Sequence, residues 1–490
     1  MIHKFCLMML SAGLFAAAQG EDATVEYKPL AFGGFSEFGL MRSGQYGETG
    51  FKNEWMDHFG AYVVQTAQVE ENLAFDVGIG GVFEYQKREI IRAQWGGTQY
   101  KSFFVGPSVA DIRYGAAARD GQGFGLQFGM FDYKYNPDAG NLGEYLFRSG
   151  TYPGYVTSGG FWFVNKNFEQ LQALRAGYAS GALKSDFFLI TETNMPALYD
   201  ISGAAVVEYK IADGLLELGA GLNFKHMIPV KPSRTSPHNA KNAYFKKDGV
   251  WYSGKDDLYL QSSAFYKNKA AKEPANAAAY LAKASDDSLK AGNVIAWMKS
   301  PKDSGITLKY YTQRGPIAMA RASLDFKKLF EWEAFGPNDM RLFAELAVLG
   351  IQDYPLYYEK ITERMPIMAG INLPTLKLLD LLSVQVEYYN SPHLNSYVDL
   401  VSTNSAVPTH VSSTDKVRSD REYNDITRHD NLSWSILARR NIGKGMSISA
   451  QAARDHIRTV SIETWTAPEP TQVLGRSGDW YWMLQFGFGI

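Results

Sequence analysis

The last eleven residues of the chain alternate between large apolar side chains and side chains that are mostly smaller or more polar. The even positions carry the large apolar residues: Trp480, Trp482, Leu484, Phe486, Phe488 and Ile490. Among the odd positions are Gln485, Gly487 and Gly489. Because side chains alternate across a β-strand, this segment predicts a strand with one apolar face and one face of mostly smaller or more polar side chains. Such an apolar face is unfavourable in water but suits a strand that meets lipid.

The same alternation recurs along the chain in segments of roughly ten residues, the length of a membrane-spanning strand. The clearest segment runs from Leu73 to Tyr85, with apolar residues at the odd positions and Asp76, Gly78, Gly80 and Glu84 among the even ones. Four further segments of this kind lie at 124–130, 216–224, 382–388 and 432–438. A water-soluble β-sandwich would also alternate, but its apolar faces would pack on one another.

Connections between these segments set the strand number and topology. Seven short turn signals lie near 70–72, 119–121, 180–181, 212–214, 330–339, 374–380 and 441–445. Eight longer polar connections lie near 43–57, 88–99, 135–166, 193–200, 228–305, 351–363, 391–430 and 457–478. Together they predict an all-β fold, a transmembrane antiparallel barrel of about 16 strands with short periplasmic turns and long extracellular loops. Counts of 14 or 18 stay open, because 152–170 and 305–327 can be divided differently.

The first 20 residues have the pattern of a secretory signal peptide. A basic start at Lys4 is followed by an apolar stretch from Phe5 to Phe15 and by small residues up to Gly20. We therefore expect a mature chain of residues 21–490 that forms one barrel domain. Its only cysteine, Cys6, would leave with the signal, so no disulfide is expected. No apolar run is long enough for a transmembrane helix.

These features resemble the Gram-negative outer-membrane porins in general architecture, without a match to one subfamily. The final segment resembles the closing strand that the barrel-assembly machinery recognises, although it ends in Ile490 where such strands usually end in Phe or Trp. The resemblance implies the bacterial outer membrane, contact with its lipids, and passive diffusion of small hydrophilic solutes such as sugars or ions. It also implies a homotrimer, for which Ala318, Ala320 and Ala322 offer a candidate contact surface.

Three long loops carry further expectations. The loop at 135–166 follows a strand whose inner face is nearly bare, with Gly123, Gly125 and Gly129, and glycine on a strand often marks the close approach of another backbone. In porins the third loop folds into the barrel and narrows the pore, whereas the alternative is that these glycines only ease curvature. The loop at 228–305 is expected to be partly helical between Pro274 and Met298, as a lid, a binding element or a solvated decoration. The loop at 391–430 is a third long connection.

Charged residues on the inner faces are the candidates for solute selection. A charge facing lipid would cost roughly 2–4 kcal/mol at the midplane, so these side chains should point into the lumen. They comprise seven acids and six bases: Asp76, Glu84, Asp111, Glu217, Asp325, Glu345 and Glu387, with Arg113, Arg175, Lys225, Arg321, Arg341 and Arg439. The near balance predicts no strong selectivity between anions and cations. Our candidates for the pore and its constriction are Asp138, Glu144, Tyr145, Phe147, Arg148, Asp111, Arg113, Glu217, Arg321 and Arg341.

No catalytic or metal-binding signature occurs in the chain. The histidines beyond the signal are scattered without ligand-like spacing, and the sequence has no Walker loop and no Gly-x-Ser-x-Gly segment. We therefore expect no enzyme activity, no cofactor and no metal. The formal net charge of −2 gives no reason to expect nucleic acid as a partner. The rival to a channel is a surface protein whose barrel anchors its long loops for adhesion or for docking polysaccharide.

Overall fold

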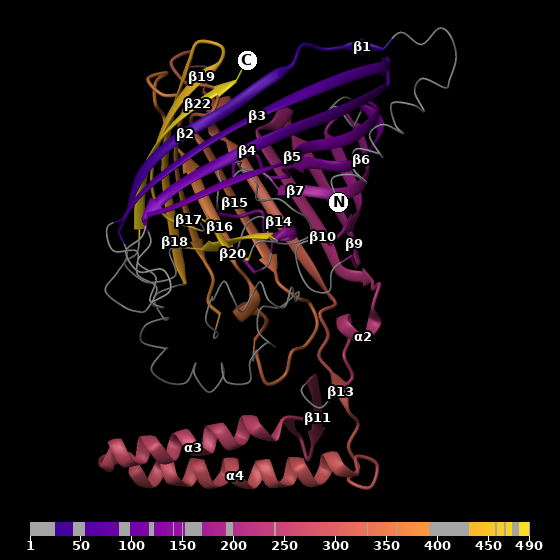
Figure 1. Cartoon of the computed structure of the whole chain (residues 1–490), viewed down its shortest axis with the longest axis vertical. Helices are drawn as coiled ribbons and strands as arrows, with labels where there is room; N and C mark the ends of the chain where they lie inside the picture. Colours follow the sequence, from indigo (N-terminus) through magenta and orange to yellow (C-terminus); the bar gives the residue numbers. More distant parts are fainter. Residues whose placement is uncertain are drawn as a thin grey trace.

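The alternating segments of the sequence form long antiparallel strands that pair in chain order, as shown by the computed structural model of the protein (Figure 1). The structure describes residues 25–42, 54–87, 99–116, 122–140, 142–148, 150–151, 169–192, 199–239, 242–330, 332–358, 360–391, 431–455, 458–464, 467–472 and 480–489. The expected signal at 1–20 and most of the loop at 391–430 therefore lie outside the described residues.

Sixteen of the described strands make up a closed barrel, which confirms the predicted fold class. The strands are β2 (Ala31–Arg42), β3 (Glu54–Glu70), β4 (Leu73–Lys87), β5 (Gln99–Gly115), β6 (Gly123–Tyr133), β7 (Glu169–Ser180), β8 (Leu183–Thr191), β9 (Ile201–Ile211), β10 (Leu216–Ile228), β14 (Gly315–Asp325), β15 (Arg341–Val348), β16 (Ile367–Asn372), β17 (Leu381–Tyr388), β18 (Leu432–Ile442), β19 (Met446–Arg454) and β22 (Trp480–Gly489). Strand β22 pairs with both β19 and β2, so the strand predicted at the end of the chain closes the sheet.

Further strands and helices lie outside the sixteen barrel strands in the sequence. Strand β1 (Glu26–Tyr27) pairs with β3, while β11 (Ala243–Lys247), β12 (Val250–Ser253) and β13 (Lys309–Tyr310) form a small sheet and β20 (Arg458–Thr464) pairs with β21 (Ala467–Gln472). The helices are α2 (Pro232–Thr235), α3 (Asp256–Lys272) and α4 (Ala277–Lys299), with 3-10 turns η2 (Tyr145–Phe147), η3 (Ala212–Gly214), η5 (Pro274–Asn276), η6 (Phe326–Leu329) and η7 (Ile361–Arg364). None of these is one of the sixteen strands of the barrel.

The outer surface of the wall is apolar, as the alternation predicted. On β6 the side chains of Phe124 and Phe128 are more than half exposed, whereas Gln127 between them is buried in the barrel. The closing strand behaves in the same way, with Phe486 and Phe488 exposed. An exposed apolar band of this kind is stable where hydrocarbon surrounds it. The candidate contact residues Ala318, Ala320 and Ala322 also lie on this outer face of β14, opposite the buried positions of the same strand.

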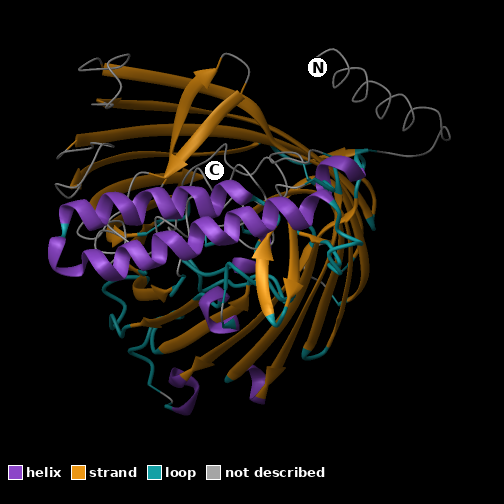
Figure 2. Ribbon diagram, turned by 90° about the horizontal axis from the view of Figure 1, so that it is seen from below, coloured by secondary structure: helices purple, strands orange, loops and turns teal. Residues whose placement is uncertain are grey.

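The long connection between β10 and β14 carries a helical hairpin. Helices α3 and α4 pack side by side beyond the end of the barrel opposite the C-terminus, and they cross that end when it is viewed from below (Figures 1 and 2). The sequence predicted helix only from Pro274 onward, but α3 begins at Asp256. The difference arises because α3 packs against α4 through contacts such as the hydrogen bond from Ser263 Oγ to the carbonyl of Ala284, at 2.7 Å, so tertiary pairing supports a helix whose own apolar pattern is weak. No helix in the described part of the chain is both long and apolar enough to cross a membrane.

Candidate functional site

The connection between β6 and β7, called loop 3 here, turns inward and lies against the inner wall of the barrel. Its described residues are 134–140, 142–148 and 150–151. Within it, the side chains of Leu142, Tyr145 and Phe147 are at most 1% exposed. A surface loop would leave such residues in water, so their burial shows that the barrel interior surrounds them.

Glu345 on β15 is the main polar anchor of loop 3. Its Oε1 accepts hydrogen bonds from the hydroxyl of Tyr135 at 2.8 Å and from the backbone N–H of Tyr145 at 2.9 Å. Its Oε2 accepts one from Nδ2 of Asn136 at 2.7 Å. Only 1% of Glu345 is exposed, so three donors replace the water that an ionised carboxylate needs. One wall residue thus fixes both ends of the loop segment 135–145.

Other wall residues bind the loop around this anchor. The Tyr145 hydroxyl donates to Glu387 on β17 at 2.8 Å, and Nε2 of Gln385 donates to the carbonyl of Asp138 at 2.9 Å. From β10, Lys225 Nζ donates to the carbonyl of Arg148 at 3.0 Å. These contacts come from strands on two sides of the loop, so loop 3 is held at several separate points.

An apolar cluster completes the attachment. It joins loop 3 to side chains of β6–β9 and β14–β16, and its members are Phe131, Tyr133, Tyr135, Ala139, Leu142, Tyr145, Leu146, Phe147, Leu171, Ala173, Phe188, Ile190, Ala204, Val206, Ile317, Met319, Phe343, Ala347, Leu349, Met368 and Tyr389. Within it the ring of Phe147 meets those of Tyr133 and Phe188 edge to face. The lumen on this side is therefore packed like a protein core rather than filled by water.

Glycines make room for the loop, but two of those expected from the sequence do not contribute. A Cβ on Gly221 of β10 would lie 2.8 Å from Leu146 Cδ2 of the loop, closer than carbon atoms approach. Gly143, at φ 80°, brings the loop backbone against Met368. On β6, by contrast, a Cβ on Gly129 would meet the backbone of β5, and a Cβ on Gly123 would meet nothing within 4 Å. Neither of those two glycines admits loop 3.

Ion pairs cover the wall beside and beneath the loop. Asp138 of loop 3 and Glu217 of β10 both bind Arg341, each at 2.9 Å. Further along the wall, Arg175 pairs with Asp186 at 2.8 Å. Other inward-facing groups continue this network: Arg113 with Asp76, Asp111 with Gln127, and Arg321 with Glu208. The acids and bases of this half of the wall thus largely neutralise one another.

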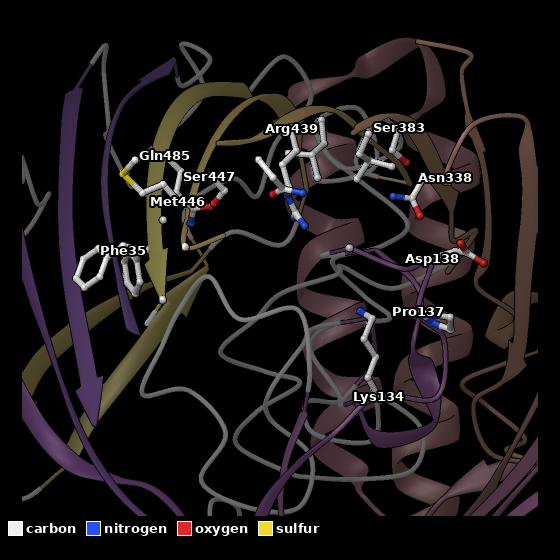
Figure 3. A pocket seen from close by; sticks show the side chains of 18 of the residues that line it. Phe35, Lys134, Pro137, Asp138, Asn338, Ser383, Arg439, Met446, Ser447 and Gln485 are labelled. Carbon is white, nitrogen blue, oxygen red and sulfur yellow. The ribbon is translucent and has the colours of Figure 1, made fainter. Parts of the chain in front are cut away.

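A cavity of about 850 Å³ remains between loop 3 and the opposite wall (Figure 3). It is bordered by loop residues 134 and 137–140 and by β2, β3, β16–β19 and β22, and it extends to the short turn between β18 and β19. Most of its polar lining is uncharged: Asn338, Asn372, Ser383, Gln385, Asn441, Ser447 and Gln485. Its charged lining consists of Lys134, Asp138, Arg439 and Lys444. Figure 3 shows Arg439 and Lys134 extending into the cavity from opposite sides.

The residues predicted for the pore divide into three groups in this arrangement. Of the five in loop 3, only Asp138 borders the cavity, whereas Glu144, Tyr145, Phe147 and Arg148 are buried between loop and wall. Glu144 adopts the left-handed conformation at φ 57°, held by backbone N–H groups that donate to its carboxylate. The wall candidates next to the loop are Glu217, Arg321 and Arg341, and those further away are Asp111 and Arg113.

Several residues at this site were not among the predicted candidates. Glu345, Glu387 and Arg439 were placed on inner faces by strand alternation, but nothing in the sequence indicated which lumen charges would meet loop 3. Lys134 follows β6 directly and Lys444 lies in the β18–β19 turn. Their positions next to strand ends are a weak signal, because lysine is common in turns.

A second buried polar cluster lies where β8, β9 and β10 reach the long-loop end of the barrel. The imidazole Nδ1 of His226 lies 2.8 Å from Glu192 Oε2 and 3.1 Å from Asp200 Oδ2, and all three side chains are fully buried. Ser202 donates its hydroxyl to Glu192, and the backbone N–H of His226 contacts Ser202 at 3.2 Å. Because both carboxylates meet the same ring nitrogen and the serine does not meet the ring, the cluster lacks the order of a Ser-His-Asp triad. Asp200 also accepts from Thr235 at 2.6 Å, which ties the start of the β10–β14 connection to the wall.

Comparison with known proteins returns solved structures of outer-membrane channels. The chain is similar to OprB of Pseudomonas putida at 10% identity and a TM-score of 0.42, covering 96% of this chain and 95% of that chain. It is also similar to OmpF of Salmonella typhi in a complex with daunomycin (8% identity, TM-score 0.39, 95% and 97% covered) and to a mutant Rh. blastica porin (7%, 0.39, 94% and 100%). No protein-family model and no curated protein sequence matches the chain.

The strand pairing of this chain itself establishes the architecture. The described strands close into a 16-stranded antiparallel barrel with an apolar outer band and a polar lumen. Among the described residues no group of three or more His, Cys, Asp or Glu side chains is placed to hold a metal ion. A closed barrel of this kind satisfies every backbone hydrogen bond within a bilayer. The chain therefore folds as a closed 16-stranded antiparallel β-barrel of the kind that spans a membrane with its strands.

Proposed function

We propose that this protein is a channel for the passive diffusion of small hydrophilic solutes across the outer membrane, without enzymatic activity. The observation that carries the proposal is the polar cavity of about 850 Å³ left beside loop 3. A barrel whose only task was to anchor loops would gain stability by filling this space with apolar side chains. Here Asn372, Ser383 and Gln485 line it instead, and removing such polar groups from water without new hydrogen bonds costs free energy, so a water-filled cavity suits them.

Loop 3 is the element that would set the width of this path. It fills one side of the lumen and is fixed to the wall by Glu345 and by an apolar cluster, so its position is determined by tertiary contacts. Solutes would pass between the loop segment 134–140 and the wall of β16–β19, β22 and β2. Selection would then depend on the width of that gap and on the charges that border it.

The test is conductance of the purified, folded protein in a planar lipid bilayer. We expect discrete conductance steps in KCl, and we expect vesicles containing the protein to swell in small neutral sugars and not in large ones. Protein unfolded by heat before reconstitution serves as the control. A barrel that is folded by circular dichroism yet gives no conductance steps would refute the proposal.

The α3–α4 hairpin favours a second candidate, a barrel that presents its loops at the cell surface. Leu281 and Leu289 of α4 are more than half exposed on this projecting element. A variant in which a short Gly-Ser linker replaces residues 256–299 separates the two functions. Under the channel proposal it conducts like the parent, whereas a surface-binding role predicts loss of adhesion or polysaccharide docking in the same variant.

A further inference from the structure

Loop 3 changes which lumen charges a permeating ion would meet. By sequence alone, the inward-facing acids and bases nearly cancel. In the structure, however, Glu144, Glu345 and Glu387 are each at most 2% exposed and lie between loop 3 and the wall. Their oxygens accept hydrogen bonds from loop 3 itself. The buried cations Arg148 and Lys225 lie in the same interface, so its positive and negative charges largely offset one another.

Three further acids of the described wall and of loop 3 are engaged by arginines. Asp186 binds Arg175 and Glu217 binds Arg341, at 2.8 and 2.9 Å. Asp138, the one acid on the described border of the cavity, binds the same Arg341 at 2.9 Å. A carboxylate whose oxygens already contact a guanidinium attracts a passing cation less than a free one does, because the two charges cancel at a distance.

The cations of the cavity are distributed differently. Its described border carries three basic side chains, Lys134, Arg439 and Lys444, against the single acid Asp138. Among the described residues, neither Arg439 nor Lys444 has an ion-pair partner. Arg439 lies on the inner face of β18, opposite Ser449 of β19 and Leu381 of β17, and its side chain extends toward loop 3 (Figure 3). Lys444 follows in the adjoining turn, so the two cations belong to the same side of the cavity.

We infer that the channel prefers small anions, which Arg439 and Lys444 attract on the wall opposite loop 3. The inference rests on the proposed channel function and names the class of solute that it favours. Field lines concentrate in a narrow aqueous path between low-dielectric walls, so two cations there act more strongly than on an open surface. Small inorganic anions and small carboxylates or phosphates share the charge that these side chains would recognise.

The experiment is the reversal potential of the folded protein in a planar bilayer under a KCl gradient. We expect the sign that corresponds to chloride passing more readily than potassium. In the double variant Arg439→Gln, Lys444→Gln the reversal potential should move toward zero or change sign, with conductance steps retained. Arg440→Gln is the control for charge removal outside the cavity, because Arg440 is exposed, is absent from the cavity border, and loses one positive charge one residue from Arg439. It should leave the reversal potential unchanged.

The outcomes separate the inference from the proposed function. Absence of conductance steps in the parent protein overturns the channel itself. Conductance steps with potassium favoured over chloride, or a double variant that matches both the parent and Arg440→Gln, overturn the anion preference and leave the channel standing. A reversal potential that favours chloride and depends on Arg439 and Lys444 supports both.

Discussion

Replacing Glu345 by Gln should release loop 3 from the wall. The amide oxygen of Gln can still accept from Tyr135 and Tyr145, but its NH2 group would face Nδ2 of Asn136, so one hydrogen bond becomes a contact between two donors. Turning the Asn136 amide over does not help, because its Oδ1 already accepts the backbone N–H of Asp138 at 3.3 Å. The two remaining bonds also weaken when their acceptor loses its charge.

The size of the effect follows from these contacts. One lost bond to a buried charged group costs about 1.5–3 kcal/mol, and weakening of the other two brings the total to about 3 kcal/mol. At about 1.4 kcal/mol for each tenfold change, the ratio of docked to released loop falls about a hundredfold. Single-channel records of Glu345→Gln should therefore show larger and more variable conductance levels than the parent, since the released loop no longer fills its side of the lumen.

Glu208→Gln provides the control for this experiment. It makes the same chemical change on β9, where Glu208 pairs with Arg321 and Lys210. It should lower the thermal midpoint slightly while leaving the conductance level as in the parent. If Glu345→Gln and Glu208→Gln give the same conductance level and the same noise as the parent, Glu345 does not hold loop 3, and the reasoning from its three hydrogen bonds is refuted.

Three further changes test other parts of the site. Gly221→Ala places a Cβ against Leu146 and should cost about 1–3 kcal/mol, displacing loop 3 and increasing conductance noise; unchanged records would show that the loop adjusts without loss. His226→Ala removes the imidazole between two buried carboxylates and should cost about 3–5 kcal/mol, measured as a lower thermal midpoint, and an unchanged midpoint would contradict this. Burial raises the pKa of Asp138, although Arg341 opposes this shift. When the pH is lowered from about 7 to about 4, Asp138 should therefore become protonated at a higher pH than a free aspartate would. The loss of its negative charge should increase the selectivity for chloride. Asp138→Asn should abolish that pH-dependent change, and an equal change in parent and variant would assign it to other groups.

The barrel itself could be predicted from the sequence because its determinants are local. Each strand shows its lipid face through alternation over about ten residues, and each short turn is marked by residues within a few positions. The segment from Leu73 to Tyr85 therefore predicted β4, with the correct faces over residues 73–81. The seven short and eight long connections predicted 16 strands. Neither inference required knowing which distant residues meet.

The helical hairpin and the attachment of loop 3 depend on contacts between distant parts of the chain. Glu345 binds Tyr135 across 210 positions, and Gly221 makes room for Leu146 across 75 positions that no local pattern connects. A glycine inside a strand fits either a bulge or a close contact, and only the position of the partner distinguishes the two. The β6 glycines illustrate this, because Gly129 faces the backbone of β5 rather than loop 3.

The distribution of lumen charge shows why a count of residues cannot predict selectivity. Seven acids and six bases on inner faces would give an almost neutral path if all of them lined it equally. In the structure, Glu345 and Glu387 do not line the solute path, because they are buried as hydrogen-bond acceptors for loop 3. Asp138 is paired with Arg341. Arg439 borders the cavity that remains. The loop that narrows the lumen thus also determines its charge, because it must bury carboxylates in order to stay attached, and any change that releases it should alter conductance and ion selectivity together.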